Sequence, residues 1–378
     1  MVLFIYIYKI MKIGLLTLPV GLGYGGIMQA FALKTALTQL GHEVILIRRI
    51  GKKHKLKRII RRTIKKYVFG KKDTIIFIDR KEEIEYPIVT KNIQPFIENH
   101  LKPFSPVYLT SSEFRNINSL DLDAIVVGSD QVWRPGYMDK VEDYFLYGID
   151  NRIKRYAYAA SFGVSTWIYT NKQTKRCKNA VKNFSAISVR EKSGVDLCKK
   201  NLDVDSILVL DPTLLFDVDF YMSHVKEHDQ TKEHKICVYI IDRSSDKMRI
   251  LNNLSKSLHK DYFFAASENE NREAPLEKRI APSIESWIDS FFSSDCVFTD
   301  SFHGCAFAII FRKPFYVYIN KERGAERFYS LAKLLGLEQC IISENTNLSD
   351  IPRIDWVKVE ENLSKMRDIS NRFLSQIK

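Results

Sequence analysis

The sequence lacks the features that mark several classes of protein. No apolar run in its 378 residues reaches the roughly 18 residues that span a bilayer, which predicts a soluble or peripheral protein. The six cysteines lie far apart without a CxxC pair, so they predict reduced core thiols rather than a zinc site or a disulfide framework. Residues 1–10, MVLFIYIYKI, are too short for a signal peptide with its cleavage site, and they read as an upstream extension or an extra strand. We therefore expect a cytoplasmic protein.

The organisation of the chain follows from an alternation of strand-like and helix-like segments. With 45% hydrophobic and 27% charged residues, the chain is long enough for two domains. The alternation breaks at a polar, charged stretch and then restarts. The predicted units are an N-terminal domain at 11–216, a linker at 217–235, a C-terminal domain at 236–345 and a helical segment at 346–378. The pattern predicts an α/β fold of two Rossmann-like parallel-sheet domains that face each other across a cleft.

The first strand–helix–strand unit contains four glycines in the loop GLGYGG, before a helix predicted over 27–40. This loop lacks the GxGxxG spacing, and the second strand ends in Arg48 and Arg49 where an acidic residue would bind a ribose. The sequence therefore argues against a nicotinamide cofactor. Gly25 and Gly26 permit two interpretations, close approach of a ligand to the helix N-terminus or a tight turn needed for packing.

A basic segment, residues 52–72, holds eleven lysines and arginines and predicts an amphipathic helix. Three interpretations remain open: a solvated helix packed by its apolar stripe, a helix at an anionic membrane surface, or a nucleic-acid arm. No nucleic-acid-binding motif accompanies the segment, so we expect no nucleic-acid partner.

His303 lies in the stretch TDSFHGCAFAIIF, between a predicted strand at 296–300 and a helix predicted to start at Gly304. The unsatisfied N–H groups of a helix N-terminus favour anions, and an imidazole can bind a phosphate or carboxylate or transfer a proton near neutral pH. A lone histidine is more often structural. Whether His303 has a chemical role therefore depends on the residues that lie near it in the fold.

Polar residues follow other predicted strands of the N-terminal domain. They are Asp130, Gln131 and Trp133 after one strand, Arg190 and Glu191 after another, and Asp211 after a third. Each alone is typical of a loop cap or an ion pair. Because the carboxyl ends of parallel strands share one edge, we expect these residues to ring one cleft with His303. An arginine, a carboxylate and a histidine suit an anionic substrate and proton transfer.

Several motifs together resemble the polysaccharide pyruvyl transferase family. They occur in the family's order over residues 11 to 340 and include GYGGIMQAFAL, DAIVVGSDQVWRP, YAASFG, ISVREKSG, LVLDPTLLF and VFTDSFHGCAFAIIFRKPF. The resemblance implies a fold similar to GT-B glycosyltransferases and transfer of pyruvate from phosphoenolpyruvate to a sugar as a ketal, usually during assembly of bacterial surface glycans such as capsule. Phosphoenolpyruvate is then a substrate, and neither a cofactor nor a metal is implied.

The resemblance also assigns roles to residues. Arg190 matches an arginine that holds the donor anion, and His303 matches a histidine implicated in donor binding or proton transfer. Asp130 approximately matches an acidic or polar position, and we expect His303 and Asp130 to be the catalytic residues that handle protons. Ser301 stands where better-studied members have an arginine. Either Lys321, Arg323 or Arg327 then substitutes as donor ligand, with Ser301 and Gly304 also binding the donor at the helix end, or the donor is a different compound. Expected acceptor or cleft residues are Gly25, Gly26, Gln131, Trp133 and Asp211.

The resemblance further suggests partners and a location. The acceptor is a glycan or a lipid-linked saccharide, and the basic segment then suggests peripheral binding at the inner face of the cytoplasmic membrane. Two alternatives stay open: a GT-B glycosyltransferase that uses a nucleotide sugar, and a non-catalytic glycan-binding relative.

Overall fold

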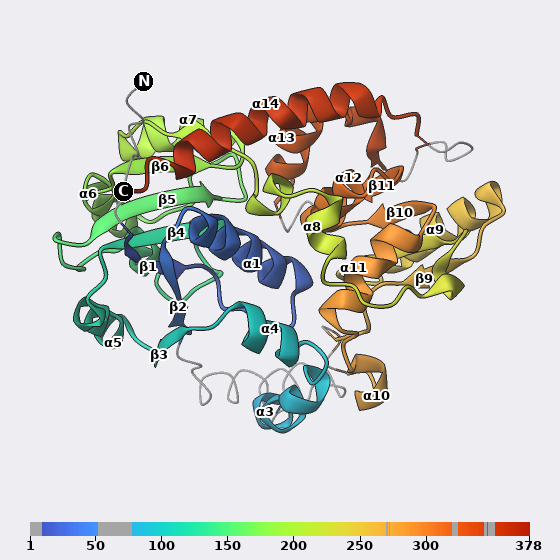
Figure 1. The fold of residues 1–378 in the computed structure, drawn as a ribbon, viewed down its shortest axis with the longest axis horizontal. Coiled ribbons are helices and arrows are strands. Elements are labelled where there is room, and N and C mark those ends of the chain that lie inside the picture. The colour runs from blue at the N-terminus through green and yellow to red at the C-terminus, as the bar shows by residue number, and fades with distance from the viewer. Residues whose placement is uncertain are drawn as a thin grey trace, which may run out of the picture.

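The computed structural model describes residues 10–51, 78–269, 271, 273–319, 324–343, 346 and 352–378. Two sheets lie side by side, each covered by helices (Figure 1). Every pairing between described strands is parallel. The basic segment 52–72 and residues 1–9 lie outside the described residues.

The N-terminal sheet has seven strands in the order β3-β2-β1-β4-β5-β6-β7. Its strands are β1 Lys12–Leu16, β2 Glu43–Arg49, β3 Phe104–Tyr108, β4 Ala124–Asp130, β5 Lys154–Ala160, β6 Ala186–Val189 and β7 Ile207–Leu208. Its helices are α1 Tyr24–Gln39, α3 Ile78–Val89, α4 Gln94–His100, α5 Ser111–Phe114, α6 Asn171–Val181 and α7 Lys192–Leu197. The central strands are continuous apolar runs because both faces of a parallel sheet are covered.

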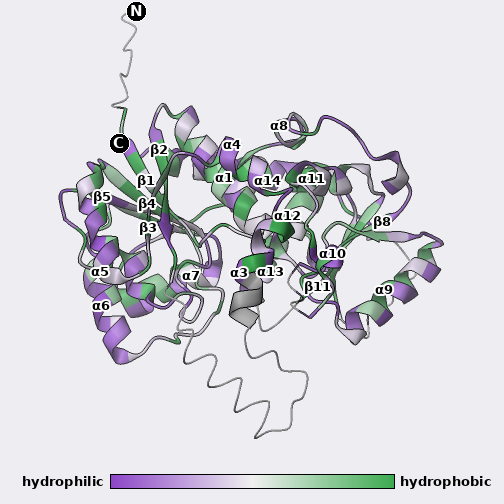
Figure 2. Ribbon diagram, turned by 90° about the horizontal axis from the view of Figure 1, so that it is seen from below, coloured by the Kyte–Doolittle hydropathy of each residue, from purple (hydrophilic) through white to green (hydrophobic). Residues whose placement is uncertain are grey.

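The C-terminal sheet has five strands in the order β12-β11-β10-β8-β9. Its strands are β8 Ile236–Tyr239, β9 Tyr262–Phe264, β10 Cys296–Thr299, β11 Phe315–Tyr318 and β12 Ile341–Ile342. Its helices are α9 Ser245–Leu258, α10 Leu276–Arg279, α11 Ile284–Ser293, α12 Phe302–Ile310 and α13 Glu326–Leu335. Outer helices such as α6 and α9 are polar on the side away from the sheets (Figure 2).

Two segments join the domains. The polar stretch after β7 forms α8, Val218–Met222, whose Tyr221 is fully buried. The C-terminal helix α14, Trp356–Leu374, crosses from the second domain back to the first (Figure 1), where the Ser370 hydroxyl accepts from the Leu210 N–H at 3.0 Å. The predicted C-terminal helical segment therefore belongs to both halves of the molecule.

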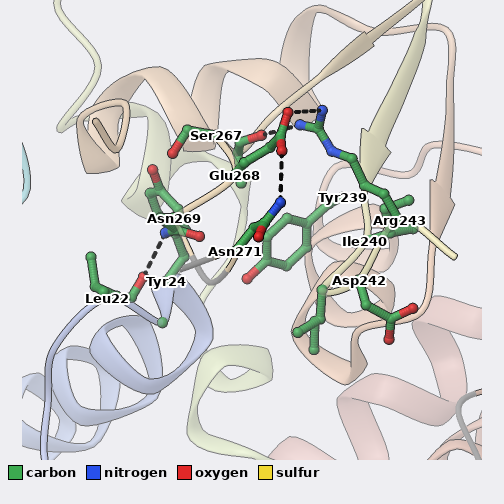
Figure 3. Close-up of a pocket in the computed structure, with 13 residues that line it drawn as sticks. Leu22, Tyr24, Tyr239, Ile240, Asp242, Arg243, Ser267, Glu268, Asn269 and Asn271 are labelled. Atoms are coloured by element: carbon green, nitrogen blue, oxygen red, sulfur yellow. Dashed lines mark hydrogen bonds and ion pairs between the residues drawn. The ribbon is translucent and has the colours of Figure 1, made fainter. Parts of the chain in front are cut away.

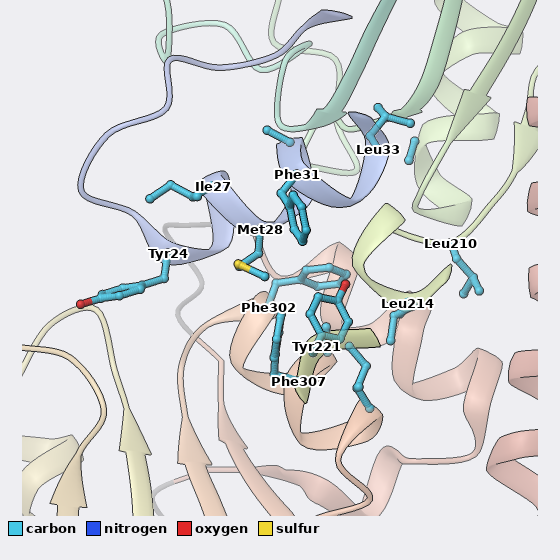
Figure 4. Packing of buried hydrophobic residues seen from close by; sticks show 14 of the residues in the cluster. Tyr24, Ile27, Met28, Phe31, Leu33, Leu210, Leu214, Tyr221, Phe302 and Phe307 are labelled. Carbon is cyan, nitrogen blue, oxygen red and sulfur yellow. The ribbon is translucent and has the colours of Figure 1, made fainter. Parts of the chain in front are cut away.

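A single apolar cluster extends across the domain boundary. It contains Phe31 of α1 and Phe307 of α12, with Tyr221 of α8 between the two helices (Figure 4). Tyr24 of α1 reaches into the second domain, where its ring stacks on Trp287 at 5.3 Å between centroids. Buried area of this kind stabilises the relative position of packed elements. The cluster thus fixes α1 against α12, the two helices that bear Gly25 and His303.

All six cysteines are free and buried, as their spacing predicted. Within the described residues, no helix combines the length and the apolar character needed to cross a membrane. One prediction is wrong in detail: α12 begins at Phe302 rather than Gly304, so His303 lies in its first turn. The small residues after His303 misplaced the start, because Ser301 had not been recognised as the N-cap.

Candidate functional site

Five charged or titratable side chains meet at the junction of the two domains. Asp130 ends β4, Arg190 follows β6 and Asp211 follows β7, so these three lie at the carboxyl edge of the N-terminal sheet. The C-terminal domain contributes His303 from α12 and Arg327 from α13. We call these five residues the charged cluster.

Arg190 is the centre of the charged cluster. Its Nη1 lies 2.5 Å from Oδ2 of Asp211, and its Nη2 lies 2.6 Å from Oδ1 of Asp130. The side chain is fully buried, and its guanidinium carbon lies 4.6 Å from the centre of the Phe302 ring. Arg190 therefore has both terminal nitrogens engaged by carboxylates in this arrangement, rather than pointing into an open cleft.

His303 lies between Asp211 and α1. Its Nε2 is 3.7 Å from Oδ2 of Asp211, close enough for an ion pair but beyond hydrogen-bonding distance. On the other edge of the ring, a Cβ atom at Gly25 would lie 2.2 Å from Nδ1. Gly25 is thus needed for close packing against the imidazole, which the sequence had left as one of two interpretations.

The charges of the cluster lower the pKa values of its two aspartates. Burial alone would raise the pKa of Asp130, but the charges of Arg190, His303 and Arg327 hold it below its ordinary value. The pKa of Asp211 is likewise lowered by His303 and Arg190 against the effect of burial. Both carboxyl groups are therefore ionised at neutral pH and cannot serve as proton donors.

The two arginines respond in opposite directions. Burial would lower the pKa of Arg190, but the carboxylates of Asp130 and Asp211 raise it. For Arg327, burial and then repulsion from Arg190 lower the pKa to about 10, although Nη1 lies 3.5 Å from Oδ1 of Asp130. An additional anion nearby would therefore favour the charged form of Arg327.

The N-terminus of α12 is already capped. The Ser301 hydroxyl accepts a hydrogen bond from the Gly304 N–H at 3.4 Å, and Ser301 is 4% exposed. A Cβ at Gly304 would lie 2.1 Å from Oγ1 of Thr299, so this glycine permits close packing of helix on strand. The expectation that Ser301 and Gly304 present open groups to a donor is not met in this arrangement, because each satisfies the other.

The remaining predicted residues are divided between the core and the domain boundary. Trp133 is fully buried, stacks on Phe145 and donates from Nε1 to the Tyr144 carbonyl at 3.0 Å, so its expected place in a cleft is wrong. Gln131 is 3% exposed, and its Oε1 accepts from Arg134 at 2.8 Å.

Lys321 and Arg323 lie outside the described residues. Arg327, the third substitute proposed for an arginine at position 301, belongs to the charged cluster.

A cavity of about 300 Å³ lies beside the cluster, between the loop before α1 and the carboxyl ends of β8 and β9 (Figure 3). Its lining includes Tyr24, Tyr239, Asp242, Arg243, Glu268 and Asn269. This site was not predicted, although the polar run ENEN directly after the predicted strand YFFAAS marks the carboxyl end of a strand.

Comparisons with known proteins bear on the family and on the fold. A family model described as polysaccharide pyruvyl transferase matches residues 24–322, more than half of the chain. A search of curated proteins found no match. A solved structure described as a UDP-N-acetylglucosamine 2-epimerase from Listeria monocytogenes is similar, with 13% identity, a TM-score of 0.52 and coverage of 97% of this chain and 91% of that chain. The E. coli ADP-heptose lps heptosyltransferase II is matched over 97% of this chain and 99% of that chain, with 10% identity and a TM-score of 0.35. The two parallel sheets and the similarity to the epimerase confirm the predicted fold of two Rossmann-like domains, GT-B-like in arrangement.

Proposed function

Because the chain belongs to the polysaccharide pyruvyl transferase family, we propose that it transfers pyruvate from phosphoenolpyruvate to two hydroxyl groups of a sugar, forming a ketal on a surface glycan or its precursor. The observation that carries the proposal is the meeting of His303 with Arg190 at one carboxylate, Asp211, where the two domains join. An imidazole and guanidinium groups in one place supply the two things that an enol phosphate requires, a proton and charge compensation.

The reaction balances without a redox partner. His303 in its protonated form delivers a proton to the methylene carbon of phosphoenolpyruvate, which makes the adjacent carbon electrophilic. A sugar hydroxyl bonds to that carbon and returns its proton to His303. The carbon–oxygen bond to phosphate then breaks, a second hydroxyl closes the ketal, and its proton leaves on the phosphate. Phosphoenolpyruvate is itself the donor, so no separate cofactor is required by this scheme.

The charged cluster supplies the donor site in our proposal. Asp130 is the exchangeable member, because its side chain is 16% exposed whereas those of Arg190 and Asp211 are fully buried. When Asp130 moves aside, the carboxylate or phosphate of the donor takes its place on Arg190 and relieves the repulsion that lowers the pKa of Arg327. Before the donor binds, Asp130 thus occupies the position on Arg190 that the donor takes. Asp130 can also act as a base, whereas its ionised state excludes the role of an acid.

The direct test is release of phosphate from phosphoenolpyruvate in the presence of a panel of bacterial surface glycans, with mass spectrometry of the glycan product. His303→Asn should lower turnover by about 10²- to 10⁴-fold. The matched control is His259→Asn, because His259 is exposed in the same domain and its φ of 51° suits asparagine. Full activity of His303→Asn would remove His303 from the chemistry.

The same assay separates the alternatives. Thermal stabilisation by a uridine or guanosine diphosphate sugar, without stabilisation by phosphoenolpyruvate, would indicate a glycosyltransferase. Binding of glycan, without release of phosphate from phosphoenolpyruvate in the presence of any acceptor in the panel, would indicate a non-catalytic relative.

A further inference from the structure

We infer that the cavity between the loop before α1 and the ends of β8 and β9 binds the sugar acceptor, as an uncharged ring rich in hydroxyl groups. The assignment of this sugar as an acceptor rests on the proposed function, whereas binding of the sugar itself does not. The cavity volume of about 300 Å³ is at the lower end of the range for small-molecule sites.

The position of the cavity suits an acceptor. Tyr24 lines it and is the neighbour of Gly25, which packs against the imidazole of His303. Tyr239 lines it from the other domain, and a Cβ at Gly304 would lie 3.1 Å from its ring. A sugar in the cavity is therefore separated from His303 by one layer of residues, so it is a neighbouring unit of the acceptor glycan, and the unit that reacts extends from the cavity toward the imidazole.

The charge of the lining argues against an anionic ligand. Asp242 and Glu268 contribute two carboxylates. Among the described lining residues the cation is Arg243, and it is engaged: Nη1 lies 3.3 Å from Glu268, Nη2 donates to the Ala266 carbonyl at 3.3 Å, and its guanidinium carbon lies 3.7 Å from the centre of the Phe264 ring. Behind the lining, Lys247 is held between Asp242 and Asp300, each at 2.6 Å. From these described groups, phosphoenolpyruvate and nucleotide diphosphates would meet an excess of negative charge.

The same groups suit hydroxyl donors. Carboxylate and amide oxygens accept hydrogen bonds from hydroxyl groups. Glu268 receives the Asn271 amide at 3.1 Å, which orients its carboxylate, and the Asn269 amide donates to the Leu22 carbonyl at 3.3 Å, which joins the cavity wall to the loop before α1 (Figure 3). The cavity therefore presents oriented acceptors from one domain and is completed by the other.

The experiment compares Glu268→Gln with Glu233→Gln, an exposed acid of the same domain. Binding of glucose, galactose, mannose and N-acetylglucosamine to the full chain is titrated by ligand-observed NMR without phosphoenolpyruvate, and KM is then measured for each substrate. Glu268→Gln should weaken sugar binding and raise the acceptor KM by about tenfold or more, with the KM for phosphoenolpyruvate unchanged. Asn271→Ala, at an exposed position, should shift the same constants less and keeps the test valid if Glu268→Gln is unstable.

The outcomes for the cavity and for the proposed function are distinguishable. Sugar constants that stay unchanged in Glu268→Gln, displacement of bound sugar by UDP, or no binding of any sugar in the panel would overturn the acceptor cavity. Sugar binding that is lost in Glu268→Gln, in a protein that releases no phosphate from phosphoenolpyruvate, would support the cavity and overturn the pyruvyl transfer.

Discussion

Gly25 of α1 and His303 of α12 are in direct contact across the domain boundary, and a Cβ on Gly25 would overlap the imidazole at 2.2 Å from Nδ1. The neighbouring residues Tyr24 and Phe302 belong to the apolar cluster that joins the domains, so neither helix can move away without losing packing. The glycine loop therefore sets the position of the histidine, which comes from the other domain.

Gly25→Ala should reduce turnover by about 10²-fold or more, because misplacing a reacting group by about 1 Å has that effect. Gly26→Ala is the matched control, since a Cβ there meets no atom within 4 Å. Alanine in place of glycine inside a helix otherwise stabilises by roughly 0.5–1 kcal/mol. Steady-state kinetics and thermal melts of both variants check the prediction, and equal activity in the two would show that the contact does not position His303.

Arg190 should matter for stability as well as for the donor. Removing one partner of a buried ion pair costs about 3–5 kcal/mol, so Arg190→Met should lower the free energy of unfolding by an amount in this range. Arg190→Lys keeps the charge but cannot bridge Asp130 and Asp211 as a planar fork does, and it should weaken binding of phosphoenolpyruvate. Arg152→Lys is the control, since Arg152 makes an exposed pair with Asp150 and should change little.

Denaturant titrations give the stability of these variants, and calorimetric titration with phosphoenolpyruvate gives donor affinity. A destabilised Arg190→Lys with wild-type donor affinity would contradict the donor role and leave Arg190 as a structural residue.

Parts of the fold follow from the sequence. The central strands could be predicted because each is an apolar run bounded by glycine, proline or aspartate, as in DAIVVGSD. β3 was missed because its residues FSPVY include Pro106 and a half-exposed pattern, which are typical of an edge strand, and β3 is indeed at the sheet edge. That α14 returns to the first domain depends on tertiary packing, which no local pattern records.

The charged cluster was only partly predictable. Asp130, Arg190 and Asp211 each follow a parallel strand, so their gathering at one edge was predictable. Their mutual ion pairs depend on side-chain directions over separations of 21 and 60 residues, which the sequence does not encode locally. That Arg327 joins the cluster could not be predicted for the same reason.

Acid should destabilise the protein through the two aspartates. Their folded-state pKa values lie below the model-peptide value of 3.8, so they contribute stability above that pH and lose it as pH falls further. Glu191 acts with the opposite sign, because burial raises its pKa above 4.5 and its protonation favours the folded state. Stability should therefore hold or rise slightly as pH falls through the range of Glu191 and then drop below about pH 3.8.

Chemical denaturation across this pH range checks the sign. Asp211→Asn should be less stable than the wild type at neutral pH and lose less stability on acidification. A wild type that loses stability steadily from neutral pH, with no difference in slope for Asp211→Asn, would show that other groups control acid unfolding.

The basic segment 52–72 tests the proposed location at a membrane. Each lysine or arginine near an anionic surface contributes about 1 kcal/mol, so replacing Arg58, Arg61, Arg62 and Lys65 by glutamine should weaken binding to phosphatidylglycerol vesicles nearly a thousandfold. The same four-charge change on exposed lysines elsewhere, at Lys91, Lys172, Lys175 and Lys182, should have a much smaller effect. Vesicle flotation at low and high salt measures both, because binding through these charges must weaken with salt. Equal flotation of the two variants, or no flotation of the wild type, would show that the segment has no membrane role. The interpretation as a solvated helix that packs on the protein by its apolar stripe would then be favoured.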